Sequence, residues 1–461
     1  MKQSTFLIPL FLFLAIGAFA PYEASSATIT ADPTALDEQS GTDAKCSLRE
    51  AVQAINQGAD STPTLTDCVA VVTDAYGTND TIILPAGTYT LTGAVVEDGN
   101  ASGDLDISKA VTIQGAGAVS TIIDGNSGAT TDRVFHVTVA VALTVDGVTI
   151  TGGYAVGASC PTGCGGGIFS NGAVTVTNST ISGNKARNFG GIWANGAVFV
   201  TNSTISNNSA GADIGGIYSN GTLTVTNSTI SGNSAGVSYG GILSMGSTTV
   251  TNSTVSGNSA GADNGGIYSN GALTVTNSTI SGNSAGISFG GIVSFSSVMV
   301  TNSTISGNTA GGGGGGIYSF SSVTVTNSTI SGNSAGASYG GIYSLGGGSI
   351  SNSTISGNRA VTGRGGGITN SNLPLSIVNS TIYGNSAPVS GAGLMSWSGT
   401  LTLTNTIVAA NTGGGGDCAI NVGFGLISSS GYNVDSDGTC GLANTGDISN
   451  SATITGSLGA L

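Results

Sequence analysis

Charged side chains are scarce in this sequence, because Asp, Glu, Lys and Arg together make up only 7% of it. With 9 basic against 23 acidic residues, it lacks the basic patch that binding to nucleic acid or to an anionic membrane requires. Proline is also rare, and glycine does not occupy every third position, so collagen is excluded. Charged helix formers are too few for a coiled coil, and a hydrophobic content of 39% argues against disorder.

Long apolar runs are missing after the first segment of the chain. Residues 6–20 are apolar but too few to span a bilayer. They follow Lys2 and precede the small residues at positions 25–27, which is the pattern of a secretory signal peptide. We therefore assign residues 1–27 to a signal peptide, with an uncleaved anchor as the alternative. We expect no transmembrane segment after cleavage and a secreted or outer cell-surface protein.

A repeat of about 25 residues dominates the rest of the chain. Gly-Gly-Ile and Asn-Ser-Thr triplets recur in phase, mostly in steps of 24 to 26 residues. A period of this size indicates a solenoid, and propeller blades would need longer repeats. In one repeat Val174 and Val176 alternate with threonines, while Ile181 and Ile192 lie in two further short apolar segments. The pattern predicts an all-β, parallel β-helix with three short strands per turn.

Two asparagine positions mark the bends of each turn, and Asn178 and Asn184 are the first regular examples. Asparagine tolerates left-handed backbone, and stacked carboxamides can form a ladder. Glycosylation of the Asn-Ser-Thr sequons is the alternative. Roughly 14 turns about 4.8 Å apart would give a rod about 65–70 Å long.

The amino-terminal residues carry a family resemblance. Residues 46–52 read Cys-Ser-Leu-Arg-Glu-Ala-Val, in which Ser47 and Glu50 form a capping box for a short helix. This stretch, with residues 80–89 and 103–107, resembles the CSLREA-domain proteins, which are secreted right-handed parallel β-helix proteins of the pectin lyase-like fold. The repeats resemble those of the polymorphic outer membrane protein family. The resemblance implies a right-handed helix, an outer-membrane or adhesin-like setting and no established catalytic residues.

Six cysteines fall in near pairs, which suits an exported protein. Proximity favours three disulfides, although other pairings are open: Cys46–Cys68, Cys160–Cys164 and Cys418–Cys440. We divide the chain after the signal peptide into a cap at 28–77, irregular first turns at 78–164, regular repeats at 165–411, and carboxy-terminal turns with a disulfide cap at 412–461.

Catalytic groups are hard to assemble from the sequence. Asp213 and Asp263 share one repeat position two turns apart, about 9.5 Å, which would suit an inverting glycosidase pair. Both lie in a variable bend, so we interpret them as solvated acids. His136 is the only histidine and has no nucleophile motif beside it, so we interpret it as structural. We therefore expect no catalytic residues and no enzyme.

The residue after each Gly-Gly-Ile should point outward and form an aromatic column. Such a ladder could bind sugars or a partner, and rings that stack on one another to cover the glycine-rich bends are the alternative. Threonine columns on other faces resemble ice-binding solenoids, but Phe199 and Met299 interrupt them. The candidate binding residues are Trp193, Tyr218, Tyr268, Tyr318 and Tyr343.

Oxygen ligands cluster in the segment before the regular repeats. Glu97, Asp98, Asp104 and Asp106 could hold Ca²⁺, although their spacing matches neither an EF-hand nor a β-roll, and a solvated acidic loop is the alternative. We expect no other cofactor. The sequence as a whole favours a monomeric, non-catalytic module that binds a glycan or a cell-surface protein. A polysaccharide-active β-helix enzyme, a lyase or glycoside hydrolase, is the second interpretation.

Overall fold

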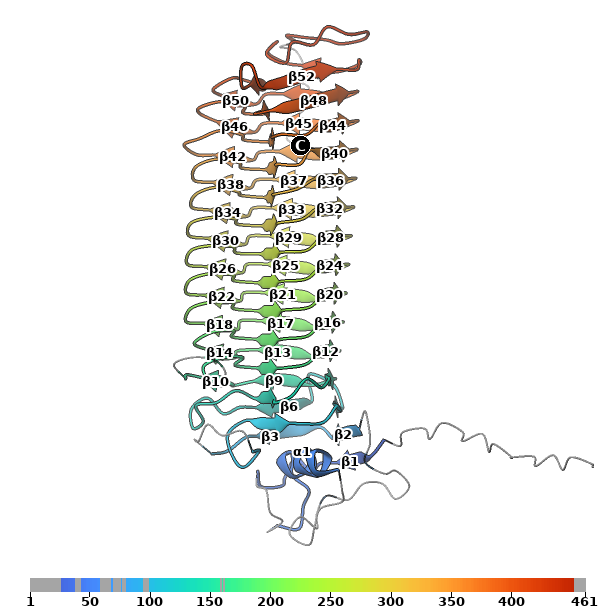
Figure 1. Cartoon of the computed structure of the whole chain (residues 1–461), viewed down its shortest axis with the longest axis vertical. Coiled ribbons are helices and arrows are strands. Elements are labelled where there is room, and N and C mark those ends of the chain that lie inside the picture. The colour runs from blue at the N-terminus through green and yellow to red at the C-terminus, as the bar shows by residue number, and fades with distance from the viewer. Residues whose placement is uncertain are drawn as a thin grey trace, which may run out of the picture.

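The protein is a rod of stacked coils with one helix at its amino-terminal end, as Figure 1 shows. The computed structural model describes residues 26–37, 43–58, 68, 76, 80–93, 99–157, 160 and 162–451. Most of the assigned signal peptide therefore lies outside the described residues. Ala27 is fully buried, and its amide donates to Asp80 Oδ1 at 2.7 Å, so the folded protein uses a residue that our boundary gives to the leader.

Each regular coil contains four strands. In the first regular coil they are β12 (Val174–Thr177), β13 (Thr180–Ser182), β14 (Lys185–Ala186) and β15 (Ile192–Ala194). Each pairs in parallel with its equivalents in neighbouring coils, which builds four sheets of 15, 14, 11 and 13 strands within the described residues. The predicted all-β parallel solenoid is confirmed. The prediction of three strands per turn missed the two-residue strand that follows each buried asparagine.

The 13-stranded sheet, called sheet C below, matters most for function. Its strands lie in one register from end to end of the rod, and most of them contain three residues. They are β4 (Leu105–Ile107), β7 (Phe135–Val137), β11 (Ile168–Ser170), β15, β19 (Ile217–Ser219), β23 (Ile242–Ser244), β27 (Ile267–Ser269), β31 (Ile292–Ser294), β35 (Ile317–Ser319), β39 (Ile342–Ser344), β43 (Ile368–Asn370), β47 (Leu394–Ser396) and β51 (Cys418–Ile420).

The core consists of apolar columns that run along the rod axis. Val176, Ile181 and Ile192 are completely buried, and each stands above the same residue type in the next coil. β-Branched side chains suit this interior because they pack well on a pleated surface. Since each coil contacts only its neighbours, stability comes from coil-on-coil stacking.

Two asparagine ladders hold the bends, as the sequence predicted. The Asn178 ladder is exposed and its residues adopt a left-handed backbone, with φ near 50°. The Asn184 ladder is buried: its Nδ2 donates to Asn208 Oδ1 at 3.0 Å and to the Ile150 carbonyl at 3.1 Å. The same bonds recur coil after coil, so these buried amides are fully satisfied.

The two ends differ. Helix α1 (Leu48–Gln57) packs against β2 (Asp80–Leu84) and β4, and its Ser47–Glu50 capping box is formed as predicted. Each near pair of cysteines forms a disulfide. At the other end, apolar side chains such as Val422 and Phe424 are exposed. Within the described residues, no helix has the length and apolar character needed to cross a membrane.

Candidate functional site

The middle residue of each sheet C strand points away from the core. The first and third residues of β15, Ile192 and Ala194, are fully buried, so Trp193 between them faces outward. Parallel pairing in register then aligns these middle residues in one column along the rod. From the amino-terminal end the column reads Asp106, His136, Phe169, Trp193, Tyr218, Leu243, Tyr268, Val293, Tyr318 and Tyr343.

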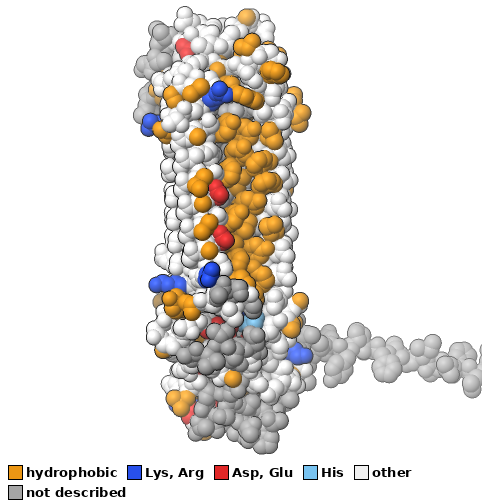
Figure 2. Space-filling view, turned by 60° about the vertical axis from the view of Figure 1, so that its left-hand side comes forward, with side chains coloured by type: hydrophobic (Ala, Val, Ile, Leu, Met, Phe, Trp, Pro, Cys, Tyr) orange, Lys and Arg blue, Asp and Glu red, His pale blue; other side chains and the backbone are white. Residues whose placement is uncertain are grey.

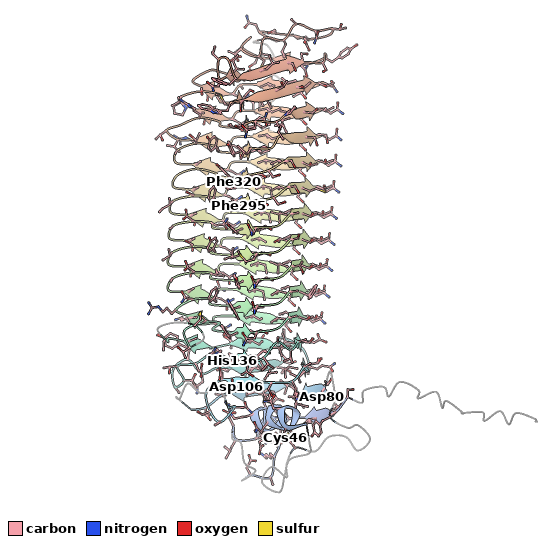
Figure 3. The ribbon with its side chains drawn as sticks, in the orientation of Figure 1. Cys46, Asp80, Asp106, His136, Phe295 and Phe320 are labelled. Atoms are coloured by element: carbon pink, nitrogen blue, oxygen red, sulfur yellow. A yellow bond between two sulfur atoms is a disulfide. The ribbon has the colours of Figure 1, made fainter. Side chains whose placement is uncertain are left out.

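Aromatic residues from two neighbouring positions widen this column into an aromatic stripe. Figure 2 shows it as a continuous apolar band along one face of the rod. On one side, bend residues with positive φ add rings, as Phe189 and Tyr239 do. On the other side lie Phe295 and Phe320, which Figure 3 labels and whose rings stack with centroids 4.3 Å apart. The stripe is thus built from three adjacent positions of the coil.

The rings stack on one another along the axis. The Phe169 and Trp193 ring planes lie 7° apart with centroids at 4.2 Å, and Trp193 continues the stack to Tyr218 at 5.8 Å. Tyr318 and Tyr343 stack in the same way at 4.5 Å. Self-stacking, the alternative raised by the sequence, therefore occurs. The stacked rings present mainly their edges to solvent, as an apolar surface of limited flexibility.

The predicted binding residues are not equally accessible. Trp193, Tyr218, Tyr268 and Tyr318 are half-buried, whereas Tyr343 is buried at 9% exposure. Leu243 and Val293 occupy the same column and are buried, so they interrupt the row of rings. The structure brings all five predicted residues onto one face and leaves four of them open to a ligand.

The stripe itself carries no charge at neutral pH. Burial, reinforced by Tyr343 and Tyr339, raises the pKa of Tyr318 to about 12, so its hydroxyl keeps its proton. Acidic side chains border the stripe in Figure 2; burial raises the pKa of Tyr239, and the charges of Asp213 and Asp263 add to that effect. Between positions 188 and 358 the sequence has no Lys or Arg. Arg364 lies beyond that span, 4.8 Å from the ring centroid of Trp397.

A buried polar cluster adjoins the amino-terminal end of the stripe. His136 Nδ1 lies 3.0 Å from Asp106 Oδ1, and its ring meets Phe169 edge-on at 5.4 Å. Arg133 Nε lies 2.7 Å from Asp104 Oδ2 and 3.3 Å from Asp132 Oδ1. All five side chains are at least 95% buried. Burial raises the pKa of Asp104 well above its usual range, and the Arg133 charge only partly offsets this.

Helix α1 fixes the loop that presents this cluster. Arg49 donates to the carbonyls of Gly103 and Asp104 at 2.8 and 2.7 Å, and pairs with Asp37 at 2.9 Å. The guanidinium of the Cys-Ser-Leu-Arg-Glu-Ala segment therefore holds the chain just before β4. Figure 3 shows Asp106 and His136 one above the other, near the helix.

The sequence-based calcium interpretation is reached only in part. Glu97 and Asp98 lie outside the described residues. Asp104 and Asp106 do lie together, but with His136, which sequence reasoning treated as a separate structural residue. The available signal was the match between Leu105-Asp-Ile107 and Phe135-His-Val137, two apolar-polar-apolar triplets that pair in register.

A second group of acids lies near the carboxy-terminal end. Asp417, Asp435 and Asp437 have oxygens within 4.8 Å of one another. Asp417 accepts hydrogen bonds from Asn411 and Ser436, and so ends the buried asparagine ladder. Asp435 accepts from the amides of Gly438 and Cys440, yet burial raises its pKa to about 6. These hydrogen bonds give the group a structural role.

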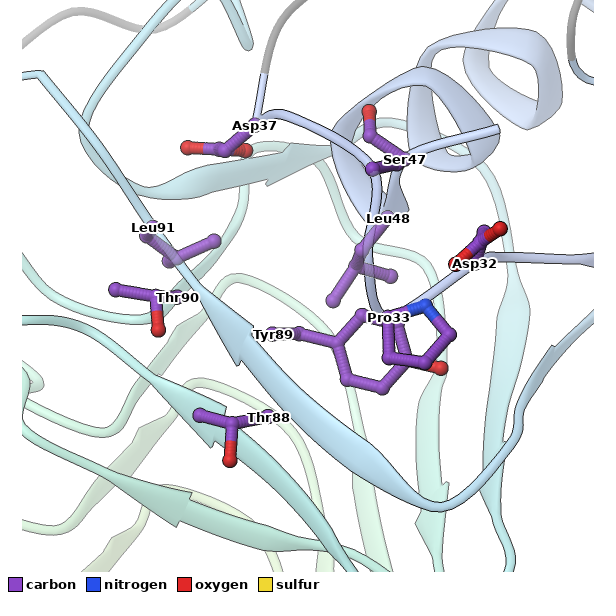
Figure 4. Close-up of a pocket in the computed structure, with 10 residues that line it drawn as sticks. Asp32, Pro33, Asp37, Ser47, Leu48, Thr88, Tyr89, Thr90 and Leu91 are labelled. Carbon is purple, nitrogen blue, oxygen red and sulfur yellow. The ribbon is translucent and has the colours of Figure 1, made fainter. Parts of the chain in front are cut away.

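Figure 4 shows a cavity of about 180 Å³ between the amino-terminal cap and β3 (Gly87–Thr90). Its two carboxylates are already engaged. Hydrogen bonds from Thr34 lower the pKa of Asp32, and Asp37 pairs with Arg49. The Tyr89 hydroxyl donates to the Pro85 carbonyl at 3.1 Å. The cavity offers no arrangement of reactive groups among the described residues.

Comparison with known proteins gives the fold but not the family. No family model and no curated protein matches the chain, so the CSLREA and polymorphic outer membrane protein resemblances are not confirmed. Among solved structures, the catalytic unit of a GH87 alpha-1,3-glucanase from Streptomyces thermodiastaticus strain HF3-3 is similar at 14% identity and TM-score 0.40, over 93% of this chain and 72% of that one.

Two further solved structures are similar over most of the rod. The A-module of mannuronan C-5 epimerase AlgE6 from Azotobacter vinelandii gives 13% identity and TM-score 0.32, over 90% and 94% of the two chains. A mannuronic acid specific polysaccharide family 6 lyase from human gut microbiota gives 10% and 0.23, over 77% and 85%. All three are polysaccharide-active enzymes, which contradicts our expectation that the chain is not an enzyme. At these identities the likeness itself shows only the β-helix fold.

Proposed function

We propose that this protein is an extracellular enzyme that binds a neutral polysaccharide along the aromatic stripe and cleaves it. The observation that supports this is the stripe itself, with its half-buried tyrosines in one column and two carboxylates at its border. From Phe169 to Tyr343 it extends over about 34 Å, since coils lie about 4.8 Å apart. Tyr and Trp offer an apolar body with a polar handle, which suits a sugar chain.

Asp213 and Asp263 are the carboxylates best placed for chemistry. They occupy equivalent bends two coils apart, about 9.5 Å, which is near the upper end of the separation used by inverting glycoside hydrolases. Both are partly exposed, so substrate can reach them. In this role one carboxyl protonates the leaving oxygen while the other activates the attacking water.

The charge of this face selects the class of polysaccharide. The middle of the stripe has two acids and no base, and its tyrosines stay protonated. A polyuronate would place like charges beside Asp213 and Asp263, which disfavours binding. Neutral glycans carry no such penalty.

The binding test uses a panel of neutral and uronate polysaccharides. Changing Tyr218, Tyr268 and Tyr318 together to Ala should weaken binding to the neutral ligand roughly 10- to 100-fold, because three rings are lost. The matched control changes Thr224, Thr274 and Thr324 to Ala on another face of the same coils and should bind as wild type. Equal binding by both triple variants would exclude the stripe. The same arm tests the adhesin-like binding expected from the sequence.

The cleavage test measures release of reducing ends. Asp213→Asn and Asp263→Asn should each lower turnover roughly 100-fold or more while leaving binding intact. Full turnover in both variants would exclude this pair, and a panel without any bound or cleaved neutral glycan would refute the proposed function.

Charge reversal tests the specificity argument. Changing both Asp213 and Asp263 to Lys should create binding to uronate polymers that weakens as salt is added. Uronate binding by the wild-type protein at least as strong as neutral-glycan binding would contradict the argument.

A further inference from the structure

We propose that Asp104, Asp106 and His136 form a binding site for a divalent transition-metal ion of the Zn²⁺ or Mn²⁺ kind. Each residue offers one ligand atom, and the three atoms lie within 4.8 Å of one another. Two carboxylate oxygens and one imidazole nitrogen are a donor set that such ions accept. This site is separate from the stripe residues that carry the proposed function.

The ligands come from two paired strands and the loop before them, and their positions are fixed from outside. Asp106 and His136 are direct partners in the β4–β7 pair. The second oxygen of Asp106 accepts the Asn100 amide at 2.8 Å, which turns Oδ1 toward His136. Arg49 holds the carbonyls of Gly103 and Asp104. Such outer contacts orient the ligands of metal sites.

A buried oxygen supplies an independent observation. Asp104 is completely buried, and although its Oδ2 pairs with Arg133, its Oδ1 receives no hydrogen bond within the described part of the chain. Leaving a buried carboxylate oxygen without a partner is costly, and a bound cation would remove that cost.

The charge balance of the cluster also leaves room for a cation. Four carboxylates, those of Asp37, Asp104, Asp106 and Asp132, lie near the two guanidiniums of Arg49 and Arg133. With neutral His136 as a ligand, four negative and two positive charges leave a net charge of −2. One divalent ion would neutralise it.

The imidazole nitrogen decides the type of ion. Ca²⁺ takes six to eight oxygen ligands, whereas nitrogen donors favour Zn²⁺, Mn²⁺ and related ions. The sequence-based Ca²⁺ interpretation relied on oxygen donors alone. A metal at this place would tie the loop before β4 to β7, and so lock the amino-terminal cap onto the first coils.

The test uses the full chain after metal removal with a chelator. Isothermal titration with Zn²⁺ and Mn²⁺ should give one site, and saturation should raise the thermal unfolding temperature, because an ion that binds only the folded state stabilises it. His136→Gln and Asp106→Asn should each weaken binding roughly 100-fold or more. Asp437→Asn in the second acidic group should bind as wild type.

Wild-type protein keeps the proposal testable if a variant does not fold. One equivalent of Co²⁺ should then give a visible d–d absorption band that Zn²⁺ abolishes by displacement. Absence of uptake of all three ions, uptake unchanged in folded His136→Gln and Asp106→Asn, or tighter binding of Ca²⁺ than of Zn²⁺ and Mn²⁺ would each overturn the proposal. These readouts do not depend on any polysaccharide.

Discussion

Single asparagines in the buried ladder each satisfy several backbone and side-chain groups. Asn258 Oδ1 accepts the Asn233 amide and its Nδ2 at 3.0 Å, while Asn258 Nδ2 donates to the Ile230 carbonyl and to Asn283 Oδ1. No water can replace these bonds easily, because the residue is fully buried. One residue therefore joins coils on both sides of its own.

Changing Asn258 to Ala should destabilise the neighbouring coils by about 3–5 kcal/mol, because several buried polar groups lose their partners at once. Native-state hydrogen exchange of the amides in the coils around residue 258 measures this. The matched control is Asn252→Gly in the exposed ladder, where the left-handed backbone suits glycine, and it should cost less than about 1 kcal/mol. Equal losses in the two variants would contradict a special role for the buried ladder.

Asp435 predicts a pH effect at the carboxy-terminal end. Burial raises its pKa from 3.8 to about 6, so the folded state binds the proton more tightly than the unfolded state does. Its contribution to stability is therefore full below pH 3.8 and is lost as the pH rises through about 6. Relative to Asp435→Asn, which does not titrate, the wild type should be more stable at pH 4 than at pH 7. Thermal unfolding at both pH values tests this, and a difference independent of pH would disprove it.

At the scale of elements, the strands that repeat were predictable and the short one was not. Val174 to Thr177 shows the alternation of a half-buried strand, and the same pattern recurs in every repeat. The two-residue strand at Lys185–Ala186 is too short to show any period. It exists because its equivalents pair above and below it, which is a property of the stack and not of the segment.

The amino-terminal cap depends on Arg49 of α1. Changing Arg49 to Met should cost about 3–5 kcal/mol in the cap, because Asp37 and the carbonyls of Gly103 and Asp104 lose a buried partner. Hydrogen exchange over residues 99–107 should accelerate, while the central coils keep their protection. Arg187→Met, at an exposed position, is the control and should change neither region. Protection unchanged at 99–107 in Arg49→Met would show that the guanidinium does not hold this loop.

Over the whole molecule, sequence predicted most where the coils are most alike. Equal 25-residue spacing places like side chains above like, so the core columns, the asparagine ladders and the aromatic column all followed from counting. The Asp106–His136 pair did not, because these residues are 30 apart and His136 and Phe169 are 33 apart. Without a constant period the register of the first coils cannot be counted, and the polar cluster appears only in three dimensions.

The same argument predicts that one coil can be removed. Deleting residues 253–277 joins Asn252 to Ser278 and stacks Thr229-Ile-Ser231 directly onto Thr279-Ile-Ser281, which keeps every inward column in phase. The rod should shorten by about 4.8 Å and keep its far-UV circular dichroism per residue. Deleting only residues 253–264 leaves a coil too short to close and should abolish the β signal around the junction. Small-angle scattering and hydrogen exchange measure both; a half-coil deletion that folds as well as the full-coil deletion would show that the 25-residue period does not set the stacking.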